Sequence, residues 1–323
     1  MTDGCGRITD YLRLSVTDKC NLRCRYCMPC EVERLSHHDI LSIEETSRIC
    51  AILCDLGIRR IRITGGEPLV RKGITELVQR LSEIDSAPAI MMTTNGVLLA
   101  DRIDSLIDAG LKSVNISLDT TDRNAYARLT GEDALQDVIA AVDAAYSSGM
   151  RVRINCVPIR GINDDELVKI AMFASDRAID VRFIELMPIG CANAYEGISS
   201  EEVRSTLTKA FGEREWAAEG GTGEGPAVYY NLRGFCGRIG YISPMSHPFC
   251  SSCNRIRLTQ TGQLKPCLYY PDSADLRKMI RGGCSDEDIK KAIMSCINNK
   301  PAEHGFGSSS PDHDNRQMFQ IGG

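Results

Sequence analysis

Short apolar runs alternate with amphipathic segments along the first 186 residues of the chain. The apolar runs have the length and composition of β-strands, and they lie at 12–16, 59–64, 89–94, 112–118, 150–157 and 180–186. Between them, apolar residues recur every three or four positions, which predicts helices over 43–56, 74–84, 103–107, 135–146 and 167–173. Six βα units in succession predict an α/β fold with a parallel sheet. Because about eight units close the usual barrel, six favour an open, partial (βα)6 barrel of the TIM type.

Polar residues with capping chemistry mark several helix starts. Ser42 with Glu45 and Asn163 with Glu166 have the spacing of capping-box pairs, and Ser199 with Glu202 repeats it. After residue 190 the pattern changes to a helix, a glycine-rich loop, short strands, two further helices and an irregular tail. We place these at 199–211, 219–227, 228–232, 237–242, 255–259, 263–270, within 274–297, and from 301 onward. We therefore divide the chain into a barrel core, 1–190, and a C-terminal region, 191–323.

Composition narrows the class of protein further. The chain has 323 residues, a formal net charge of −5 and no apolar run of membrane-spanning length. Its start also lacks the apolar stretch of a signal peptide, so we expect a cytoplasmic protein with no membrane partner. An acidic chain of this kind is not expected to wrap nucleic acid, although it can still hold a local basic pocket for a small anion.

Three closely spaced cysteines are the first residues that indicate a metal or iron–sulfur site. Cys20, Cys24 and Cys27 form a C-x3-C-x2-C pattern just after the first predicted strand. A structural zinc ion prefers four ligands, so three cysteines are one short. In a cubane 4Fe–4S cluster each corner is one iron, and three cysteines leave one iron free to bind something else.

This pattern resembles that of the radical S-adenosylmethionine (radical SAM) enzymes. Tyr26 stands where the superfamily carries an aromatic residue, and "GGEP" at 65–68 matches its motif for the amino group of the cofactor. The resemblance implies that the open iron chelates S-adenosylmethionine. It also implies that the cofactor site is lined by Tyr26, Gly66, Ser117 and Met187.

A second cysteine set lies in the C-terminal region. Cys250, Cys253 and Cys267 form a C-x2-C-x13-C pattern, again with three ligands. A structural zinc site remains an alternative here, completed by Cys236, Cys284 or His247. Arg255 and Arg257 follow Cys253 at alternate positions of a predicted strand, so both guanidinium groups face one side and can meet one anion.

The two cysteine sets together resemble the GTP 3′,8-cyclase family, which begins molybdenum cofactor biosynthesis. The shared motifs run in family order: "LRLSVTDKCNLRCRYCMP", "IRITGGEPL", "TTNG", "NISLD", "GIND", "RFIELMPIG", "CSSCNRIRL" and the terminal Gly322–Gly323. The resemblance implies a second 4Fe–4S cluster on Cys250, Cys253 and Cys267. It implies GTP contacts from Arg13, Arg62, Thr93, Arg160, Arg255, Ile256 and Arg257. Arg160 departs from the pattern, since lysine is common before "GIND". The catalytic residues implied are Arg255, Arg257, Gly322 and Gly323.

The family chemistry sets the expected function. A 5′-deoxyadenosyl radical from S-adenosylmethionine removes the hydrogen at C3′ of GTP, and C3′ then attacks C8 of guanine to give 3′,8-cyclo-7,8-dihydro-GTP. The expected partners are GTP, a low-potential electron donor and the cyclic pyranopterin monophosphate synthase that takes the product. We expect a monomer or a homodimer.

Two other functions remain open from the sequence. A radical SAM enzyme that modifies a peptide or protein would share the first cysteine set, although such enzymes carry a longer, cysteine-richer C-terminal region. A non-enzymatic iron–sulfur electron carrier would have no use for "GGEP", the arginine pair or a six-unit barrel. We can assign no role to Cys30 or Cys191.

Overall fold

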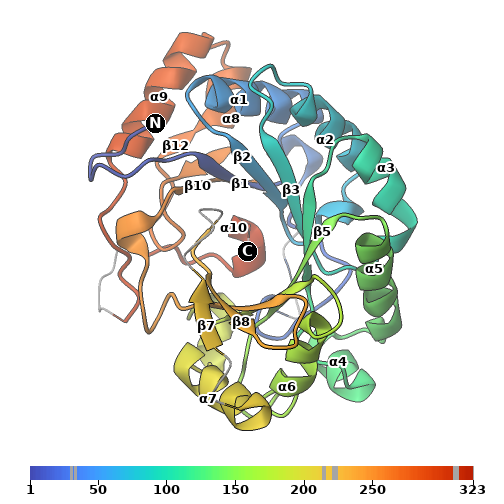
Figure 1. The fold of residues 1–323 in the computed structure, drawn as a ribbon. Coiled ribbons are helices and arrows are strands. Elements are labelled where there is room, and N and C mark those ends of the chain that lie inside the picture. Colours follow the sequence, from blue (N-terminus) through green and yellow to red (C-terminus); the bar gives the residue numbers. More distant parts are fainter. Residues whose placement is uncertain (30–31, 33–34, 213–215, 220–224, 308–312, 323) are drawn as a thin grey trace.

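The structure is a computed structural model that describes residues 1–29, 32, 35–212, 216–219, 225–307 and 313–322. Six parallel strands form its centre: β1 (Tyr11–Ser15), β2 (Arg60–Thr64), β3 (Ala89–Thr94), β4 (Ser113–Ser117), β5 (Arg151–Cys156) and β6 (Asp180–Ile184). The helices between them are α1 (Ile43–Asp55), α2 (Ile74–Ser82), α3 (Ile103–Asp108), α4 (Arg123–Thr130), α5 (Leu135–Ser147) and α6 (Leu167–Ala171). Figure 1 shows the strands curving around a central space with these helices outside. The predicted partial barrel is therefore confirmed.

The C-terminal region adds further elements: α7 (Ser200–Phe211), β7 (Trp216–Glu219), β8 (Val228–Leu232), β9 (Arg238–Ile242), β10 (Arg255–Leu258), β11 (Gln263–Lys265), β12 (Ala274–Asp275), α8 (Leu276–Arg281), α9 (Asp286–Asn298) and α10 (Met318–Ile321). Its strands extend the barrel sheet at both edges. β10 pairs in parallel with β1, and β9 pairs in parallel with β6. The described strands thus form one sheet in the order β12-β11-β10-β1-β2-β3-β4-β5-β6-β9-β8-β7. The division at residue 190 stays a prediction.

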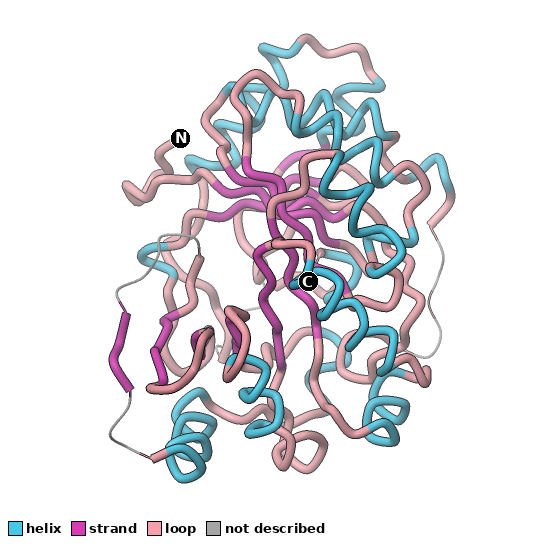
Figure 2. The backbone as a smooth tube through the Cα atoms, turned by 45° about the vertical axis from the view of Figure 1, so that its right-hand side comes forward, coloured by secondary structure: helices cyan, strands magenta, loops and turns pink. Residues whose placement is uncertain are grey.

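Apolar side chains on alternate strand positions face outward and pack against the helices. Leu12 and Leu14 of β1 and Ile61 and Ile63 of β2 are fully buried in this layer. The strand residues between these outward-facing ones point into the barrel interior, and most of them are polar. Figure 2 shows the strands gathered inside and the helices outside them. The fold therefore buries its hydrophobic core between sheet and helices and leaves a polar space inside the barrel.

Two of the three predicted capping boxes are confirmed. Ser42 with Glu45 caps α1, and Ser199 with Glu202 caps α7. The prediction at Asn163 is wrong, because α6 begins at Leu167 and the Asn163 side chain is used elsewhere. Its amide donates to the carbonyls of Asp119 and Val157, and its oxygen accepts from the Ile159 amide. An asparagine that forms hydrogen bonds with three backbone groups in this way cannot be distinguished from a helix-capping residue by sequence alone.

Three other details differ from the sequence prediction. The strand predicted at 263–270 ends at Lys265, because Pro266 lacks the N–H that a ladder needs. The helix α4 was not predicted, and neither was α10 in the tail that we expected to be irregular. Figure 1 shows α10 and the C-terminus at the centre of the barrel. The loop predicted at 219–227 falls mostly outside the described residues.

Candidate active site

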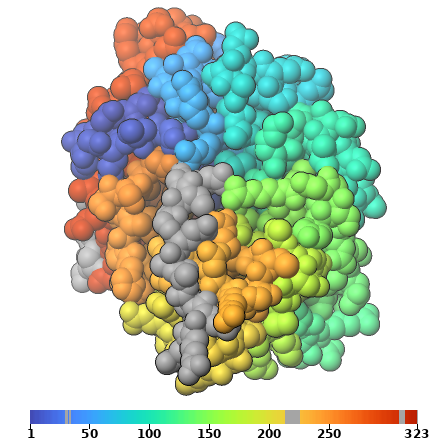
Figure 3. Space-filling model, viewed as in Figure 1, coloured from blue at the N-terminus to red at the C-terminus, as the bar shows by residue number. Residues whose placement is uncertain are grey.

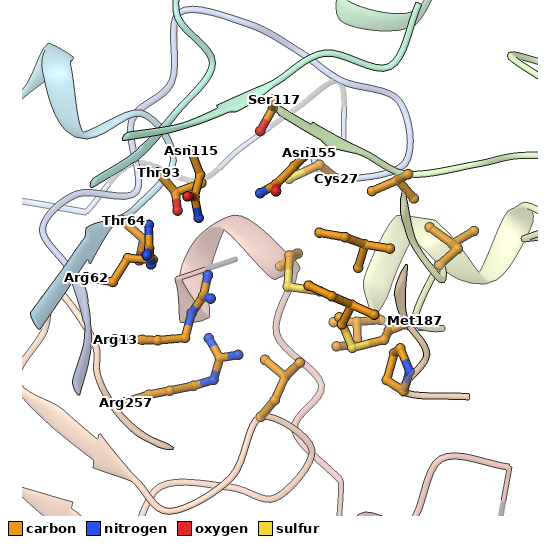
Figure 4. A pocket seen from close by; sticks show the side chains of 18 of the residues that line it. Arg13, Cys27, Arg62, Thr64, Thr93, Asn115, Ser117, Asn155, Met187 and Arg257 are labelled. Carbon is orange, nitrogen blue, oxygen red and sulfur yellow. The ribbon is translucent and has the colours of Figure 1, made fainter. Parts of the chain in front are cut away.

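The barrel encloses a cavity of about 350 Å³ lined from every strand β1 to β6 and from the C-terminal region. Both predicted cysteine sets line it, and so do most of the other predicted site residues: Arg13, Tyr26, Arg62, Gly66, Thr93, Ser117, Met187, Arg255 and Arg257. In Figure 4 the side chains of Arg13, Arg62 and Arg257 gather on one side of this space, with Cys27 and Met187 on the other. The fold thus brings together groups that lie far apart in the sequence.

The first cysteine loop follows β1 and is held by α4. The amide of Arg23 donates to the Thr130 carbonyl at 2.7 Å, and the amide of Arg25 donates to the Leu129 carbonyl at 3.0 Å. Inside the loop, the amides of Cys27 and Met28 both donate to the Cys24 carbonyl. The helix missing from the sequence prediction is therefore the one that shapes this loop.

The "GGEP" segment packs directly against the chain that leads into the cysteine loop. The Gly66 amide donates to the Thr17 carbonyl at 2.7 Å, and a Cβ on Gly66 would lie 2.5 Å from the Lys19 carbonyl oxygen. Only glycine permits this approach. Glu67 is fully buried, and its carboxylate accepts hydrogen bonds from the amides of Leu69 and Asn95 and from the Thr94 hydroxyl. Burial raises the pKa of Glu67 to about 7.

Tyr26 is fixed by an aspartate that the sequence analysis did not single out. Its hydroxyl donates to Asp119 Oδ2 at 2.7 Å, while Asp119 Oδ1 accepts from the Val157 amide at 2.8 Å. Burial raises the pKa of Asp119 to about 6. Asp119 closes "NISLD" at the end of β4, and it ties the cysteine loop to the ends of β4 and β5.

The second cysteine loop is held by two buried cations from distant parts of the chain. Arg7 donates to the Cys250 carbonyl at 2.8 Å, and Lys300 Nζ donates to the Cys253 carbonyl at 2.6 Å. In Figure 3 the N-terminal segment, in dark blue, lies beside the orange segment that contains this loop. Burial opposes ionisation of Cys253, but the charges of Arg255 and Lys300 outweigh it and lower the pKa of this thiol to about 7.

The donor chemistry of both sets fits iron–sulfur clusters better than single ions. All cysteines of the described residues are free thiols. Within that part of the chain, no three His, Cys, Asp or Glu side chains come close enough together to hold one metal ion. A cubane spreads its ligands, because each cysteine binds a different iron. Cys236, Cys284 and His247, the candidates for completing a zinc site, do not line the cavity.

Five arginines and two carboxylates are among the described residues that line the cavity. Arg62, Arg13 and Arg257 occupy one row, since Arg13 is in register with Arg62 on β2 and with Arg257 on β10. Burial lowers the pKa of Arg257 well below its ordinary value, and the neighbouring positive charges of Arg13 and Arg255 lower it further. Burial likewise lowers the pKa of Arg182, which the sequence analysis missed, to about 10. A row of buried cations of this kind is suited to a polyanionic ligand.

The C-terminal tail reaches this arginine row. The carbonyl of Gly322 accepts a hydrogen bond from Arg257 Nη1 at 2.5 Å. Gly322 has φ +76°, and a Cβ on it would lie 2.9 Å from both Ser15 Cβ and Thr64 Oγ1. A side chain does not fit there, so glycine is required on two counts.

Several predicted residues are not brought to the cavity. Arg160 is exposed and forms ion pairs with Glu196 and Glu202, and the Ile256 side chain is buried on the outer face of β10. Gly323 and Cys30 lie outside the described residues. Cys191 is a free thiol beside the tail, where its amide donates to the Gln317 side chain.

Polar residues that the sequence analysis missed also line the cavity. They include Tyr11, Thr64, Thr94, Asn95, Asn115, Asp119, Asn155, Arg182, Glu185 and His304. The alternation of polar and apolar residues along the strands could have indicated some of them. Asn115 and Asn155, for example, stand at inward positions between apolar residues of β4 and β5.

Comparison with known proteins defines first the class and then the family. A model of the radical SAM superfamily matches residues 14–174, and a model described as Molybdenum Cofactor Synthesis C matches residues 179–306. The chain is therefore a radical SAM protein. Its fold resembles the crystal structure of Streptococcus suis SuiB bound to precursor peptide SuiA, with a TM-score of 0.61 over 97% of this chain and 76% of that one. At 16% identity this likeness shows the fold alone.

Relatives at higher identity decide the family. The chain is 40% identical over 326 residues to the GTP 3′,8-cyclase of Clostridium perfringens (strain 13) and 43% identical over 329 residues to that of Thermodesulfovibrio yellowstonii. Each match covers 100% of both chains. The chain belongs to the GTP 3′,8-cyclase family. No helix among the described residues has the length and apolar character needed to cross a membrane.

Proposed function

We propose that this chain is a GTP 3′,8-cyclase that acts in molybdenum cofactor biosynthesis with S-adenosylmethionine and two 4Fe–4S clusters. The observation that carries the proposal is one cavity that is lined both by the two cysteine sets and by the arginine row. A peptide-modifying enzyme would not need this concentration of buried cations. The relatives at 40–43% identity support the same substrate.

The clusters have definite ligands in the proposal. Cys20, Cys24 and Cys27 would hold the first cluster, and Cys250, Cys253 and Cys267 would hold the second. When bound, the first cluster would supply the electron that cleaves S-adenosylmethionine, and the second would provide an iron site for guanine. Tyr26, Gly66, Ser117 and Met187 would surround S-adenosylmethionine. The close backbone approach at Gly66 leaves no room for a side chain at this position.

The arginine row binds the triphosphate of GTP. Arg13, Arg62 and Arg257 present their guanidinium groups on one side of the cavity, and Arg255 and Thr93 complete the contacts. Charge-assisted bonds to phosphate are strong and directional. They fix the nucleotide so that C3′ faces the cofactor side and C8 faces C3′. Arg160 has no part in this binding, because its guanidinium is paired at the surface.

The barrel also protects the reaction. One hydrogen atom leaves C3′, and one electron and one proton are added after C3′ bonds to C8, so the product is an isomer of GTP. A cavity inside the barrel limits the access of water and of other side chains that would quench the radicals. We extend the proposal to a low-potential electron donor, to transfer of the product to cyclic pyranopterin monophosphate synthase, and to a cytoplasmic monomer or homodimer. A reducing compartment suits the free thiols.

The test is turnover with purified protein reconstituted without oxygen. Iron analysis should give about eight irons per chain. Each ribonucleoside triphosphate is then incubated separately with S-adenosylmethionine and dithionite. We expect 5′-deoxyadenosine and a cyclised isomer from GTP alone. Turnover of another nucleotide or of a peptide, with none from GTP, would refute the proposal.

A further inference from the structure

Lys265 is the most deeply buried cation among the described residues of the C-terminal region. Its side chain is 0% exposed, and it lies at the end of β11, in register with Arg257. Its ammonium group donates to the Asp314 carboxylate and, at 2.5 Å, to the Tyr270 carbonyl. A buried ammonium is stable only with such partners. Its anionic partner, Asp314, comes from a segment 49 residues further along the chain.

Four charged side chains join these two segments. Lys265 and Asp272 belong to the segment around the third cysteine of the second set, and Asp314 and Arg316 belong to the C-terminal tail. Arg316 donates to Asp314 at 2.6 Å and to Asp272 at 2.5 Å. Each segment therefore supplies one acid and one base, and the charges balance. We call these four side chains the tail latch.

Beyond the latch the tail turns into the barrel and stays buried. The Gln317 side chain accepts from the Cys191 amide at 2.8 Å, and Phe319 and Ile321 are 2% and 1% exposed. The short helix α10 then delivers Gly322 to Arg257. Only five residues separate Arg316 from Gly322, so the position of the latch sets how far the tail reaches into the cavity.

We propose that Lys265 and Asp314 are positioning residues that hold the C-terminal tail at the depth where Gly322 meets Arg257. The inference rests on the proposed function, in which Arg257 contacts the triphosphate of GTP. When the latch is broken, the tail withdraws and Arg257 loses the carbonyl that orients it. GTP is then held less firmly, and C3′ and C8 are no longer kept in reacting geometry.

Hydrogen exchange of the tail tests whether the latch holds it. Lys265→Met and Asp314→Asn are compared with wild type as reconstituted full chains, by hydrogen–deuterium exchange with mass spectrometry. We expect peptides that cover 317–322 to exchange at least tenfold faster in both variants. Peptides from β1 to β6 should be unchanged. Asp286→Asn is the matched control, because it breaks an exposed ion pair with Arg48 elsewhere.

Turnover of the same samples tests the positioning role. We expect the ratio of cyclised product to 5′-deoxyadenosine to fall at least fivefold in both latch variants, because radical formation continues while the substrate is poorly held. The iron content should stay at the wild-type value. A general loss of stability would lower product and 5′-deoxyadenosine together.

Two results would contradict the inference, one from hydrogen exchange and one from turnover. Unchanged exchange in the tail shows that the latch does not hold it, and faster exchange with an unchanged product ratio shows that tail depth does not matter. If the two variants do not fold, Arg316→Gln replaces them, since Arg316 is 29% exposed and its loss weakens the latch without removing its buried pair. The same criteria then apply, with about threefold effects. A wild-type enzyme that makes no product from GTP refutes the proposed function instead, while the exchange data still decide whether the latch holds the tail.

Discussion

Replacing Arg13 with methionine should stabilise the GTP-free protein while weakening GTP binding. Arg13 stands between Arg62 and Arg257 in the arginine row. Burial, together with the charges of Arg255, Arg62 and Arg182 and in spite of the opposing effect of Tyr11, lowers the pKa of Arg13 from its ordinary value to about 10. Because this lowering disfavours the charged form in the folded state, the cost is fully present below pH 10 and fades as the pH rises from there toward the ordinary pKa of arginine.

The size of the effect follows from that shift. Each pKa unit corresponds to about 1.4 kcal/mol, so the lowering of the Arg13 pKa to about 10 corresponds to about 3.5 kcal/mol for a dry site. Water in the cavity screens part of this cost, so we expect the free energy of unfolding to rise by about 1–2 kcal/mol at pH 7.5. Loss of one charge-assisted phosphate contact costs about 1.5–3 kcal/mol, so GTP should bind about 10- to 100-fold more weakly.

The free energy of unfolding and the affinity for GTP are both measured on anaerobically reconstituted protein. Chemical denaturation without GTP gives the stability, and a GTP titration gives the affinity. Arg80→Met, which removes an exposed arginine paired with Glu76, is the control and should change neither value by much. An Arg13→Met variant that is less stable and binds GTP as tightly as wild type would refute the reasoning about the arginine row.

Three shorter predictions follow from buried or exposed charges. Glu166 accepts from Lys169 and Thr121, which overcome burial and lower its pKa to about 2, so Glu166→Gln should cost about 2–3 kcal/mol at pH 7 in a denaturation experiment. That difference should disappear as the pH falls from 4.5 toward 2; a constant difference would contradict the cause. Lys300→Met removes the cation on the Cys253 carbonyl and should lower iron toward about four per chain, with the first cluster's electron paramagnetic resonance signal retained. Full iron content would show that Lys300 is not needed for the loop. Arg160→Ala should change GTP affinity less than about twofold, whereas a tenfold loss would place Arg160 at the substrate.

The local pattern of the chain was enough to predict the barrel strands and the helices with strong periodicity. β1 to β6 and the capping boxes of α1 and α7 came from period and capping chemistry alone. Helix α4 was not predicted, because its eight residues, "RNAYARLT", are mostly polar and show too weak a helical periodicity of apolar residues. Its capping residue Asp122 and the glycine at its end, Gly131, were the available signals.

Contacts between distant segments were beyond the reach of the sequence pattern. Nothing in the residues of β9 and β10 says that they pair with β6 and β1 at opposite edges of the sheet. The same is true of Lys265 and Asp314, because charged residues are usually exposed and only the fold shows that this pair is buried. The two cysteine sets were the easiest part of the candidate site to predict, because cysteine spacing is a local property. The arginine row needed the strand register, which only the folded sheet provides.

Transfer of the C3′ hydrogen of GTP tests the central claim most directly. GTP that carries deuterium at C3′ is incubated with the reconstituted protein, S-adenosylmethionine and dithionite, and the isotopic content of 5′-deoxyadenosine and of product is read by mass spectrometry. We predict one deuterium in 5′-deoxyadenosine and its loss from the cyclised product. Unlabelled 5′-deoxyadenosine beside a product that keeps its deuterium would contradict abstraction at C3′ and with it the assigned reaction.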